Sequence, residues 1–229
     1  MALEPIIVGW SGGKDSALAL REVLRSSRCQ VVALVTTCTE GCDRISMHGV
    51  RCCLLEAQAE SLGIPLTKVY IPQRCTNLEY EKRMKEAFSS FKSIGVKIVV
   101  YGDLFLEDIR VYRDRMLAEI GVSALYPVWG RATHALAREF IADGFKANLV
   151  CVDSSKLPAS FAGRMFNSEL LADLPEGIDP CGENGEFHTF VSSGPIFHRT
   201  IHCQSGLVVE REGFIFADLL PKPVDLTFT

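Results

Sequence analysis

Six consecutive residues near the start of the chain carry groups suited to holding phosphate. The stretch Ser-Gly-Gly-Lys-Asp-Ser occupies residues 11–16 and closely follows the apolar run Ile6–Val8. A turn of small residues between a buried strand and a helix exposes backbone N–H groups at the positive end of the helix dipole, where phosphate oxygens bind. Lys14 adds a positive charge, and the hydroxyls of Ser11 and Ser16 add two donors. The segment is therefore a candidate site for a nucleotide triphosphate.

The same stretch does not fit two common phosphate-binding motifs. The Walker A pattern requires Gly, any four residues and then Gly-Lys-Ser/Thr. Here Asp15 follows Lys14, and no glycine stands at the required position before Gly13. The dinucleotide pattern G-x-G-x-x-G fails as well. The structural alternative is a tight turn in which Gly12 and Gly13 provide the geometry and Ser16 or Asp15 caps the helix. The strand–turn–helix context favours a functional loop over this alternative.

Imidazole and carboxylate side chains in two later stretches could serve acid–base chemistry. His48 lies in EGCDRISMHGVR, residues 40–51, and could stabilise an α phosphate or transfer a proton. Glu183, Glu186 and His188 lie in CGENGEFHTFV, residues 181–191, where strand alternation would place Glu186 and His188 on one face. These three could bind ammonium or remove a proton from an attacking amine. The alternative for each stretch is a solvated surface loop.

Several further residues are candidates for the same cleft. Gly102 and Asp103 directly follow the run Lys97–Tyr101, and a simple strand-end turn is the alternative. Arg131 follows Trp129 at a change of pattern, where both could line a cleft between domains. The remaining substrate-binding or nucleotide-binding candidates are Asn184, Thr189 and Thr36.

Repeated strand and helix patterns must position these residues. Predicted strands cover residues 6–8, 30–37, 66–71, 97–101 and 122–126, and predicted helices cover residues 16–25, 50–62, 77–94 and 107–120. The strand runs are apolar throughout, which is typical of a parallel sheet covered by helices on both faces. The prediction is a doubly wound α/β domain. Ligands bind such sheets beyond the carboxyl ends of the strands, where residues 11–16 lie.

The pattern changes after Tyr126–Arg131, and we place a domain boundary there. Residues 1–129 form the predicted nucleotide-binding domain and residues 130–229 a predicted smaller α+β domain that recognises the substrate. A helix over 133–143 and a strand over 146–153 precede a region broken by Pro and Gly. Short strands follow, with predicted turns at Ser205-Gly206 and Glu212-Gly213. An exposed edge in this region could pair with a second copy to make a homodimer.

Composition narrows the class of protein. A formal net charge of -4 over 229 residues makes nucleic acid an unlikely partner. No run approaches the roughly 20 apolar residues that span a bilayer, and the first residues lack the basic character of a signal peptide. We therefore expect a cytoplasmic protein without membrane association. Nine cysteines, an odd number, favour reduced thiols.

With these features in place, residues 11–16 resemble the PP-loop of the N-type ATP pyrophosphatases, whose pattern is Ser-Gly-Gly-x-Asp-Ser. The resemblance implies the fold of that superfamily and a loop around the β and γ phosphates of ATP. It also implies cleavage between the α and β phosphates, with pyrophosphate leaving together with Mg²⁺. Donors and Lys14 around the leaving group would stabilise the charge that grows there. Asp15 is the expected Mg²⁺ contact.

Over essentially its whole length, the chain resembles the diphthine–ammonia ligase family. The resemblance rests on SGGKDS, Gly102-Asp103, YPVWGR and the stretches at 40–51 and 181–191. In that family the enzyme adenylates the carboxylate of diphthine on elongation factor 2, and ammonia then displaces AMP. The resemblance implies an ATP-dependent ligase that activates a carboxylate or an amide oxygen and transfers ammonia or an amine. Expected catalytic residues are Lys14, Asp15, His48, Glu183 and Glu186.

The C-terminal motif departs from the pattern of the archaeal and eukaryotic members. They resemble Glu-Gly-Gly-Glu-Phe/Tyr-Glu-Thr/Ser, whereas Asn184 and His188 stand here in place of Gly and Glu. The variant is similar to the bacterial branch, for which the resemblance suggests a corrinoid-related small molecule as the acceptor. The acceptor is thus either a small molecule or a modified protein side chain.

Two other functions remain open. PP-loop sulfur transferases use cysteines, and the spacing of Cys38, Cys42, His48 and Cys52 admits a metal cluster, although no C-x-x-C pair is present. The other possibility is a sensor that holds ATP without turning it over. Products of ATP turnover would distinguish these functions from a ligase.

Overall fold

The computed structural model describes residues 3–46 and 48–222. Its first sheet has five parallel strands in the order β3-β2-β1-β4-β5. These strands are β1 (Glu4–Gly9), β2 (Cys29–Thr39), β3 (Leu66–Ile71), β4 (Ile98–Val100) and β5 (Ser123–Leu125). The strand order reverses beside β1, so a ligand crevice is expected at the carboxyl end of this strand. The predicted doubly wound parallel sheet is confirmed.

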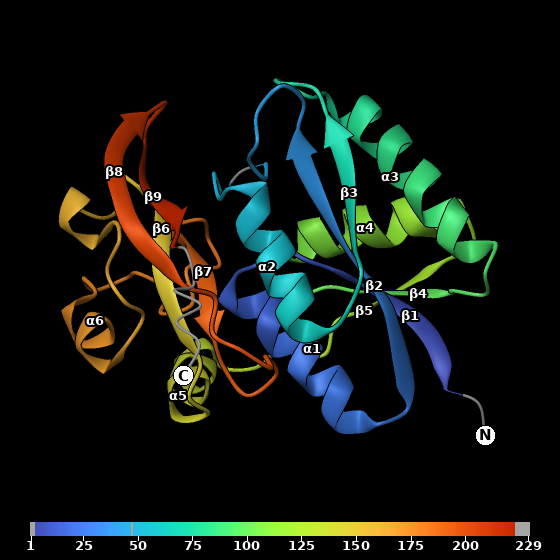
Figure 1. Ribbon diagram of the computed structural model, residues 1–229, viewed down its shortest axis with the longest axis horizontal. Helices are drawn as coiled ribbons and strands as arrows, with labels where there is room; N and C mark the ends of the chain where they lie inside the picture. Colours follow the sequence, from blue (N-terminus) through green and yellow to red (C-terminus); the bar gives the residue numbers. More distant parts are fainter. Residues whose placement is uncertain (1–2, 47, 223–229) are drawn as a thin grey trace, which may run out of the picture.

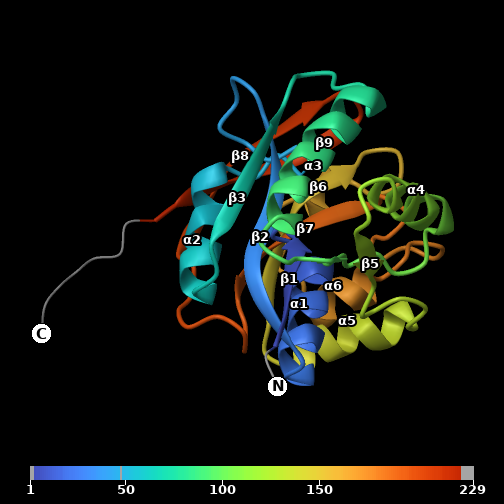
Figure 2. The same cartoon turned by 90° about the vertical axis from the view of Figure 1, so that its right-hand side faces the viewer.

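Helices cover both faces of this sheet because its strands are apolar on both faces. They are α1 (Lys14–Ser26), α2 (Cys52–Leu62), α3 (Asn77–Lys92) and α4 (Glu107–Ala118). Along β1, Ile6 and Val8 belong to a core cluster shared with α1 and α2, whereas Ile7 belongs to a second cluster shared with α3 and α4. The alternation follows from the two-residue period of a strand. Figure 2 views the molecule with α3 in front.

The second sheet is antiparallel, with the order β7-β6-β9-β8. Its strands are β6 (Lys146–Asp153), β7 (Phe187–Ser193), β8 (Cys203–Arg211) and β9 (Phe214–Pro221), and the accompanying helices are α5 (Thr133–Ala142), η1 (Ala159–Phe161) and α6 (Ser168–Asp173). The predicted smaller α+β region is therefore confirmed. In Figure 1 the strand β7 lies on the side of this sheet that faces α1 and α2.

One hydrophobic core joins the two sheets. Buried Trp10 and Leu18 of the first part belong to the same cluster as Phe187 and Phe190 of β7. The apolar surface buried at this junction stabilises the packing of β7 against the first sheet, by about 25 cal/mol for each Å² removed from water. The boundary at residue 129 remains a prediction.

The structure corrects four local predictions. Ser205-Gly206 is not a turn, because β8 continues through it, with irregular pairing to β9 between Ser205 and Val208. Residues 198–202 belong to the C-terminal region in which short strands were predicted, and they lie outside the strands. The helix α6 was not predicted. The predicted helix start at Val50 is two residues early, since α2 begins at Cys52. The turn at Glu212-Gly213 is confirmed between β8 and β9. Among the described residues, no helix has the length and apolar character needed to cross a membrane.

Candidate active site

The phosphate-loop candidate, residues 11–16, connects β1 to the first turn of α1. Gly12 has a φ of +76°, a conformation that glycine adopts without strain. The amide of Gly13 donates to Ser11 Oγ at 3.2 Å, and Ser16 Oγ donates to the Gly13 carbonyl at 2.9 Å. Gly13 is the N-cap of α1 and provides no side-chain cap, so neither Asp15 nor Ser16 has the capping position that the structural alternative gave them.

Lys14 is buried inside the site and remains an ammonium. It is 2% exposed, its Nζ lies 2.8 Å from Asp15 Oδ2, and it stands 5.5 Å from the centre of the Phe187 ring. Burial acts to lower the pKa of Lys14, but nearby Asp15, Cys181 and Glu183 outweigh it and raise the pKa. A fixed positive charge is therefore held at the start of α1.

Asp15 has one oxygen that pairs with Lys14 and another that makes no hydrogen bond to the described residues. Its Oδ1 is buried, and no hydrogen-bond partner for it exists in the described part of the chain. Burial raises the pKa of Asp15, Lys14 acts in the opposite direction, and Asp179 and Asp103 raise it further. An additional cation would relieve this accumulation of negative charge, and a carboxylate oxygen suits Mg²⁺.

Strand β7 binds directly to the loop. The amide of Lys14 donates to Thr189 Oγ1 at 3.0 Å, and the amide of Val191 donates to the Gly12 carbonyl at 2.9 Å. A Cβ atom on Gly13 would lie 3.0 Å from the Thr189 carbonyl oxygen, so the two backbones approach closely. The candidate phosphate loop and the C-terminal motif therefore form one site, although 175 residues separate Lys14 from Thr189.

Gly102 provides the space in which α1 begins. A Cβ atom at this position would lie 2.6 Å from the carbonyl carbon and oxygen of Asp15 and 2.8 Å from the amide nitrogen of Ser16. Atoms of the backbone cannot move aside as a flexible side chain can. Gly102 thus packs against the phosphate-loop candidate, next to where a ligand was predicted.

Replacing Gly102 with alanine is expected to displace the first turn of α1. The overlap with Asp15 backbone atoms should lower the melting temperature and weaken ATP binding together, with a cost of about 1–3 kcal/mol, typical of overpacking. Thermal unfolding and calorimetric titration with ATP measure the two effects. A variant with wild-type stability and affinity would contradict the close packing described here.

Asp103 pairs with an arginine of α4 and, through its charge, affects the loop. Arg113 Nε lies 3.0 Å from Asp103 Oδ2, and the Arg113 guanidinium stands 4.1 Å from the centre of the Tyr101 ring. The negative charge of Asp103 contributes to the raised pKa of Asp15. Asp103 therefore lies close to the loop, engaged in an ion pair.

Glu183 joins the end of β4 to the C-terminal motif. Its Oε1 accepts a hydrogen bond from the amide of Leu104 at 2.7 Å, and its own amide donates to Asp179 Oδ2 at 2.9 Å. Burial raises the pKa of Glu183 to about 7, the bond from Leu104 lowers it, and the charge of Asp15 raises it. A carboxyl with this pKa can accept or release a proton near neutral pH.

Glu186 is 2% exposed and binds elements of its own loop. Its Oε1 accepts from the Asn184 side chain at 3.1 Å and from the Asp179 amide at 3.3 Å. Its Oε2 is buried without a hydrogen-bond partner among the described residues. Glu186 binds Asn184 and Asp179, whereas His188 contacts His48, and the placement of Glu186 and His188 on one face stays a prediction.

His188 stacks on His48 and joins β7 to the loop that follows β2. The ring centres lie 4.2 Å apart with an angle of 19° between the planes. Burial lowers the pKa of His188 to about 4, with Lys14 acting in the same direction. Burial, His188 and Lys14 together lower the pKa of His48 well below its usual value. Both imidazoles are neutral at neutral pH.

Acid is expected to destabilise the fold through this histidine pair. Between about pH 6.5 and pH 4 the unfolded chain binds protons that the folded His188 does not, so the free energy of unfolding should fall as the pH falls. In the double variant His48→Gln/His188→Gln this dependence should be shallower, as measured by urea unfolding across the window. His134→Gln, at an exposed position of α5, is the control. An unchanged slope in the double variant would contradict the neutral buried pair.

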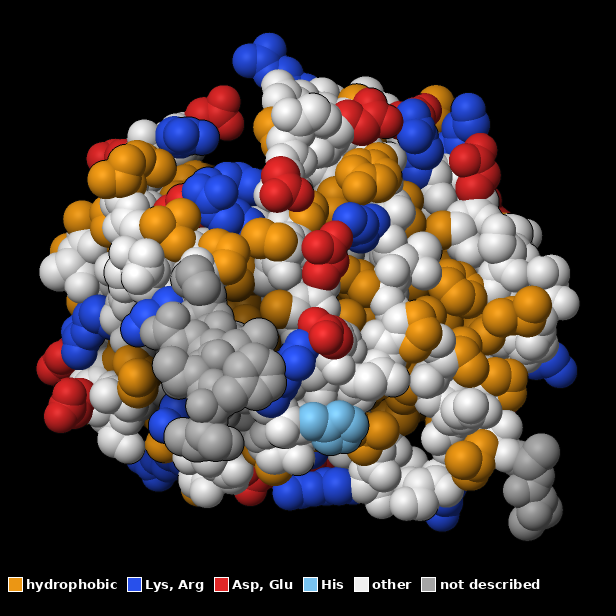
Figure 3. Space-filling model, in the orientation of Figure 1, with side chains coloured by type: hydrophobic (Ala, Val, Ile, Leu, Met, Phe, Trp, Pro, Cys, Tyr) orange, Lys and Arg blue, Asp and Glu red, His pale blue; other side chains and the backbone are white. Residues whose placement is uncertain are grey.

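Two arginines hold the loop carrying His48 against β9. Arg44 lies 2.9 Å and Arg51 2.6 Å from the carboxylate of Asp218, and Arg44 also donates to the Gly49 carbonyl. Figure 3 shows Lys and Arg side chains at a notch between the β8–β9 hairpin and the loop after β2. The partner of both arginines is Asp218.

The remaining predicted residues contact other parts of the chain. Thr36 is buried within β2. Arg131 lies 2.5 Å from Glu139, which also pairs with buried Arg21 of α1. The structure therefore gives Arg131 a partner in α5, and within the described residues no hydrogen bond or ion pair joins it to residues 11–16.

The cysteines are thiols without a metal cluster. No group of three or more His, Cys, Asp or Glu residues among positions 3–46 and 48–222 is arranged to hold a metal ion. Cys38 and Cys52 lie 3.1 Å apart at their sulfurs, and burial raises the pKa of Cys52 to about 12. Burial likewise raises the pKa of Cys181, beside Lys14, to about 12. None of these thiols is activated as a thiolate.

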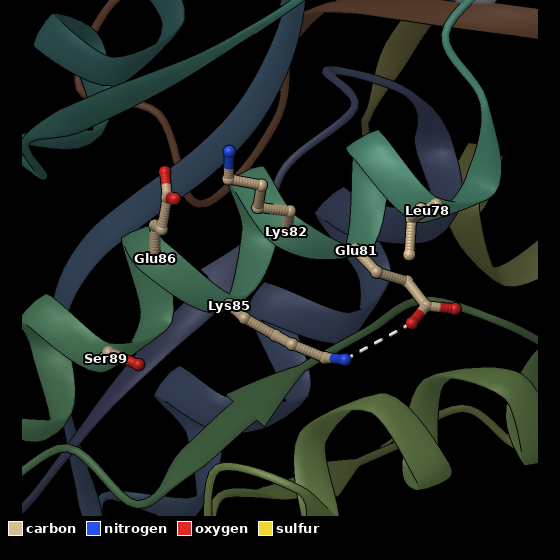
Figure 4. A pocket seen from close by; sticks show the side chains of 6 residues that line it. All are labelled: Leu78, Glu81, Lys82, Lys85, Glu86 and Ser89. Atoms are coloured by element: carbon tan, nitrogen blue, oxygen red, sulfur yellow. Dashed lines mark hydrogen bonds and ion pairs between the residues drawn. The ribbon is translucent and has the colours of Figure 1, made fainter.

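One surface depression lies away from these groups. A hollow of about 610 Å³ is lined by residues of α3, including Leu78 and Ser89, with Lys85 paired to Glu81 across it. Figure 4 shows these side chains spread along the outside of one helix. No side chain of residues 11–16 or of β7 lines it, so it is not the candidate site.

Three residues at the site were not predicted from the sequence. From the sequence, Gln58 of α2 resembles an ordinary polar position of an amphipathic helix. In the structure it is fully buried against the loop at residues 11–16. Asp179 and Asp218 lie in stretches without a motif. The one sequence signal for the burial of Gln58 is the number of small and apolar residues around it, in LLEAQAESL.

The chain matches models of one known family over most of its length. The model described as the diphthamide synthase N-terminal domain matches residues 5–124, and the model of the diphthamide synthase C-terminal domain matches residues 132–216. A diphthine–ammonia ligase of Danio rerio is 26% identical, over 83% of this chain and 83% of the relative. A diphthine–ammonia ligase of Homo sapiens is 25% identical, over 90% of this chain and 85% of the relative.

Proposed function

The chain belongs to the diphthamide synthase family, and from this premise we propose that it adenylates a carboxylate and replaces AMP with ammonia. The protein is an ATP-dependent ligase. Its two relatives above are named for diphthine and ammonia, which makes a diphthine carboxylate the first acceptor to consider. The observation that carries the proposal is the direct contact of Lys14 with Thr189, which joins the ATP loop to the acceptor motif.

The ATP-binding part of the proposal rests on residues 11–16. The amide and hydroxyl donors of the loop and the Lys14 ammonium would bind the β and γ phosphates, with the charge of Lys14 maintained by the carboxylates of Asp15 and Glu183. Pre-arranged around the oxygen that gains charge when pyrophosphate leaves, these groups would lower the barrier. Thr189 now occupies the amide of Lys14, so its hydroxyl must move or share this donor when phosphate binds.

Asp15 would hold Mg²⁺ through its free Oδ1. The fit rests on the buried, unpartnered oxygen and on the excess of carboxylates nearby. When bound, the ion would neutralise charge on the leaving pyrophosphate.

Glu183 is proposed as the group that accepts a proton from the attacking amine. Its pKa of about 7 leaves a substantial ionised fraction at neutral pH, and the bond to the Leu104 amide fixes one of its oxygens. Glu186, with Asn184 and Asp179 on its other oxygen, is proposed to orient the nitrogen donor or the acceptor. The neutral pair His48 and His188 would border the acceptor without adding positive charge. A corrinoid-related small molecule remains the alternative acceptor.

The test supplies the protein with ATP, Mg²⁺, ¹⁵N-ammonium and elongation factor 2 that carries diphthine. Mass spectrometry should find ¹⁵N in the amide of the modified side chain, and only when ATP is present. Corrinoid carboxylates serve as a parallel acceptor. Failure of ¹⁵N transfer to any carboxylate, with ATP consumed, would contradict the proposed reaction.

A further inference from the structure

We infer that Gln58 is a positioning residue that holds the phosphate loop and strand β7 in the conformation that binds ATP. Gln58 belongs to α2, is completely buried and is distant in sequence from both segments that it joins. The inference rests on the proposed function, because it concerns the loop at which ATP is proposed to bind.

Three hydrogen bonds engage both polar atoms of the Gln58 side chain. Its Oε1 accepts from Trp10 Nε1 at 2.9 Å, and its Nε2 donates to the Gly12 carbonyl at 3.0 Å and to the Val191 carbonyl at 2.6 Å. The indole N–H of Trp10 can only donate, so Oε1 must face it. Both amide hydrogens of Gln58 are then left for the two carbonyls. The orientation of the amide is therefore determined by its surroundings.

The bond to Gly12 determines the orientation of a peptide group within the loop. The Gly12 carbonyl receives hydrogen bonds from Gln58 and from the Val191 amide. In a planar trans peptide, the carbonyl of one residue and the N–H of the next point in opposite directions. Holding the Gly12 carbonyl therefore keeps the Gly13 N–H on the opposite side, where it bonds Ser11 Oγ inside the loop. The positive φ of Gly12 makes this geometry accessible.

The bond to Val191 extends this control to the C-terminal motif. Val191 follows Thr189 on β7 by two residues, and Thr189 accepts from the Lys14 amide. Loosening Gln58 would therefore disturb both the loop and the strand that carries His188 and Thr189. Buried carbonyls left without a donor also favour rearrangement of the segments that carry them.

The test is the affinity of the full-length protein for α,β-methylene-ATP with Mg²⁺, measured by calorimetry. This analogue cannot be cleaved between the α and β phosphates and needs no acceptor. Gln58→Met keeps the size of the side chain and removes its hydrogen bonds, so we expect binding to weaken by about tenfold or more. The substitution Trp10→Phe removes the donor to Gln58 Oε1 and lets the Gln58 amide rotate, so it should weaken binding of the analogue by a smaller factor. This variant replaces Gln58→Met in the experiment if Gln58→Met does not fold.

Ser61→Ala is the matched control. Ser61 lies one turn along α2, is 1% exposed and makes two hydrogen bonds, of 2.6 and 3.0 Å, with the backbone of Arg199. Ser61 joins α2 to the C-terminal part of the chain without contacting the phosphate loop. The Ser61→Ala substitution should therefore lower the melting temperature while leaving the affinity for the ATP analogue within about twofold of wild type.

The outcomes separate this inference from the proposed function. Folded Gln58→Met with wild-type affinity, or equal losses of affinity in Gln58→Met and Ser61→Ala, would overturn the positioning role. A wild-type protein that binds the analogue but ligates no acceptor would contradict the proposed reaction and leave the positioning role standing. Selective loss of affinity in Gln58→Met and Trp10→Phe would support it.

Discussion

Replacing Lys14 with methionine is expected to slow the formation of AMP by about 10²–10³-fold, the effect of removing one pre-arranged group that stabilises transition-state charge. The ammonium is buried at the start of α1, and the carboxylates of Asp15 and Glu183 help to raise its pKa, so it is charged at neutral pH. Methionine fills similar space beside Phe187 without the charge. Rapid-quench analysis of labelled ATP measures the rate.

Lys68→Met is the control for this substitution. Lys68 of β3 also pairs with a carboxylate, Glu56, at 2.6 Å, but it lies outside the candidate site. AMP formation should be unchanged in that variant. If Lys14→Met forms AMP at the wild-type rate while circular dichroism indicates a native fold, the role of Lys14 in ATP cleavage is excluded.

Replacing Glu183 with glutamine is expected to lower acceptor amidation by about 10²–10⁴-fold, as for loss of a general base, while ATP affinity changes little. In the wild-type protein the amidation rate should rise with pH around the Glu183 pKa of about 7, because only the ionised carboxylate accepts a proton. Glutamine retains the bond from the Leu104 amide and should abolish this step in the profile. Repeating the pH profile with hydroxylamine in place of ammonia separates the ionisation of Glu183 from the ionisation of ammonium.

The same substitution should stabilise the fold at alkaline pH. A carboxyl whose pKa is raised in the folded state contributes stability that is present below its unfolded pKa of about 4.5 and is lost as the pH rises through about 7. Glu183→Gln should therefore raise the melting temperature above pH 7 and leave it nearly unchanged at acid pH. A lower melting temperature of the variant above pH 7 would contradict the costly burial of the charged group.

The parallel sheet could be predicted because its strands are apolar on both faces. Ile6, Ile7 and Val8 enter two different cores, and such continuous runs indicate a sheet covered on both sides. The turn at Ser205-Gly206 was wrong because a glycine in an irregular edge strand has the same local signal as a glycine in a turn. The helix α6 was missed in a region rich in Pro and Gly, although Asn167 caps it by accepting from the Leu170 amide.

The site could be predicted in part. Residues 11–16 carry a local pattern that is visible without a structure. The stack of His48 on His188 and the three bonds of Gln58 join segments far apart in the chain, and no local periodicity indicates such pairs. Arg131, chosen for its place at the change of pattern, turned out to have Glu139 as its partner.

The identity of the products of ATP tests most directly whether the loop at residues 11–16 binds pyrophosphate as the leaving group. With Mg²⁺, ammonia and a diphthine-bearing or corrinoid acceptor, ³¹P NMR should detect AMP and pyrophosphate in equal amounts, matched by the amide formed. This follows if the loop at residues 11–16 holds the β and γ phosphates as the leaving group. ADP and phosphate as the main products would contradict cleavage between the α and β phosphates, and with it the account of this site.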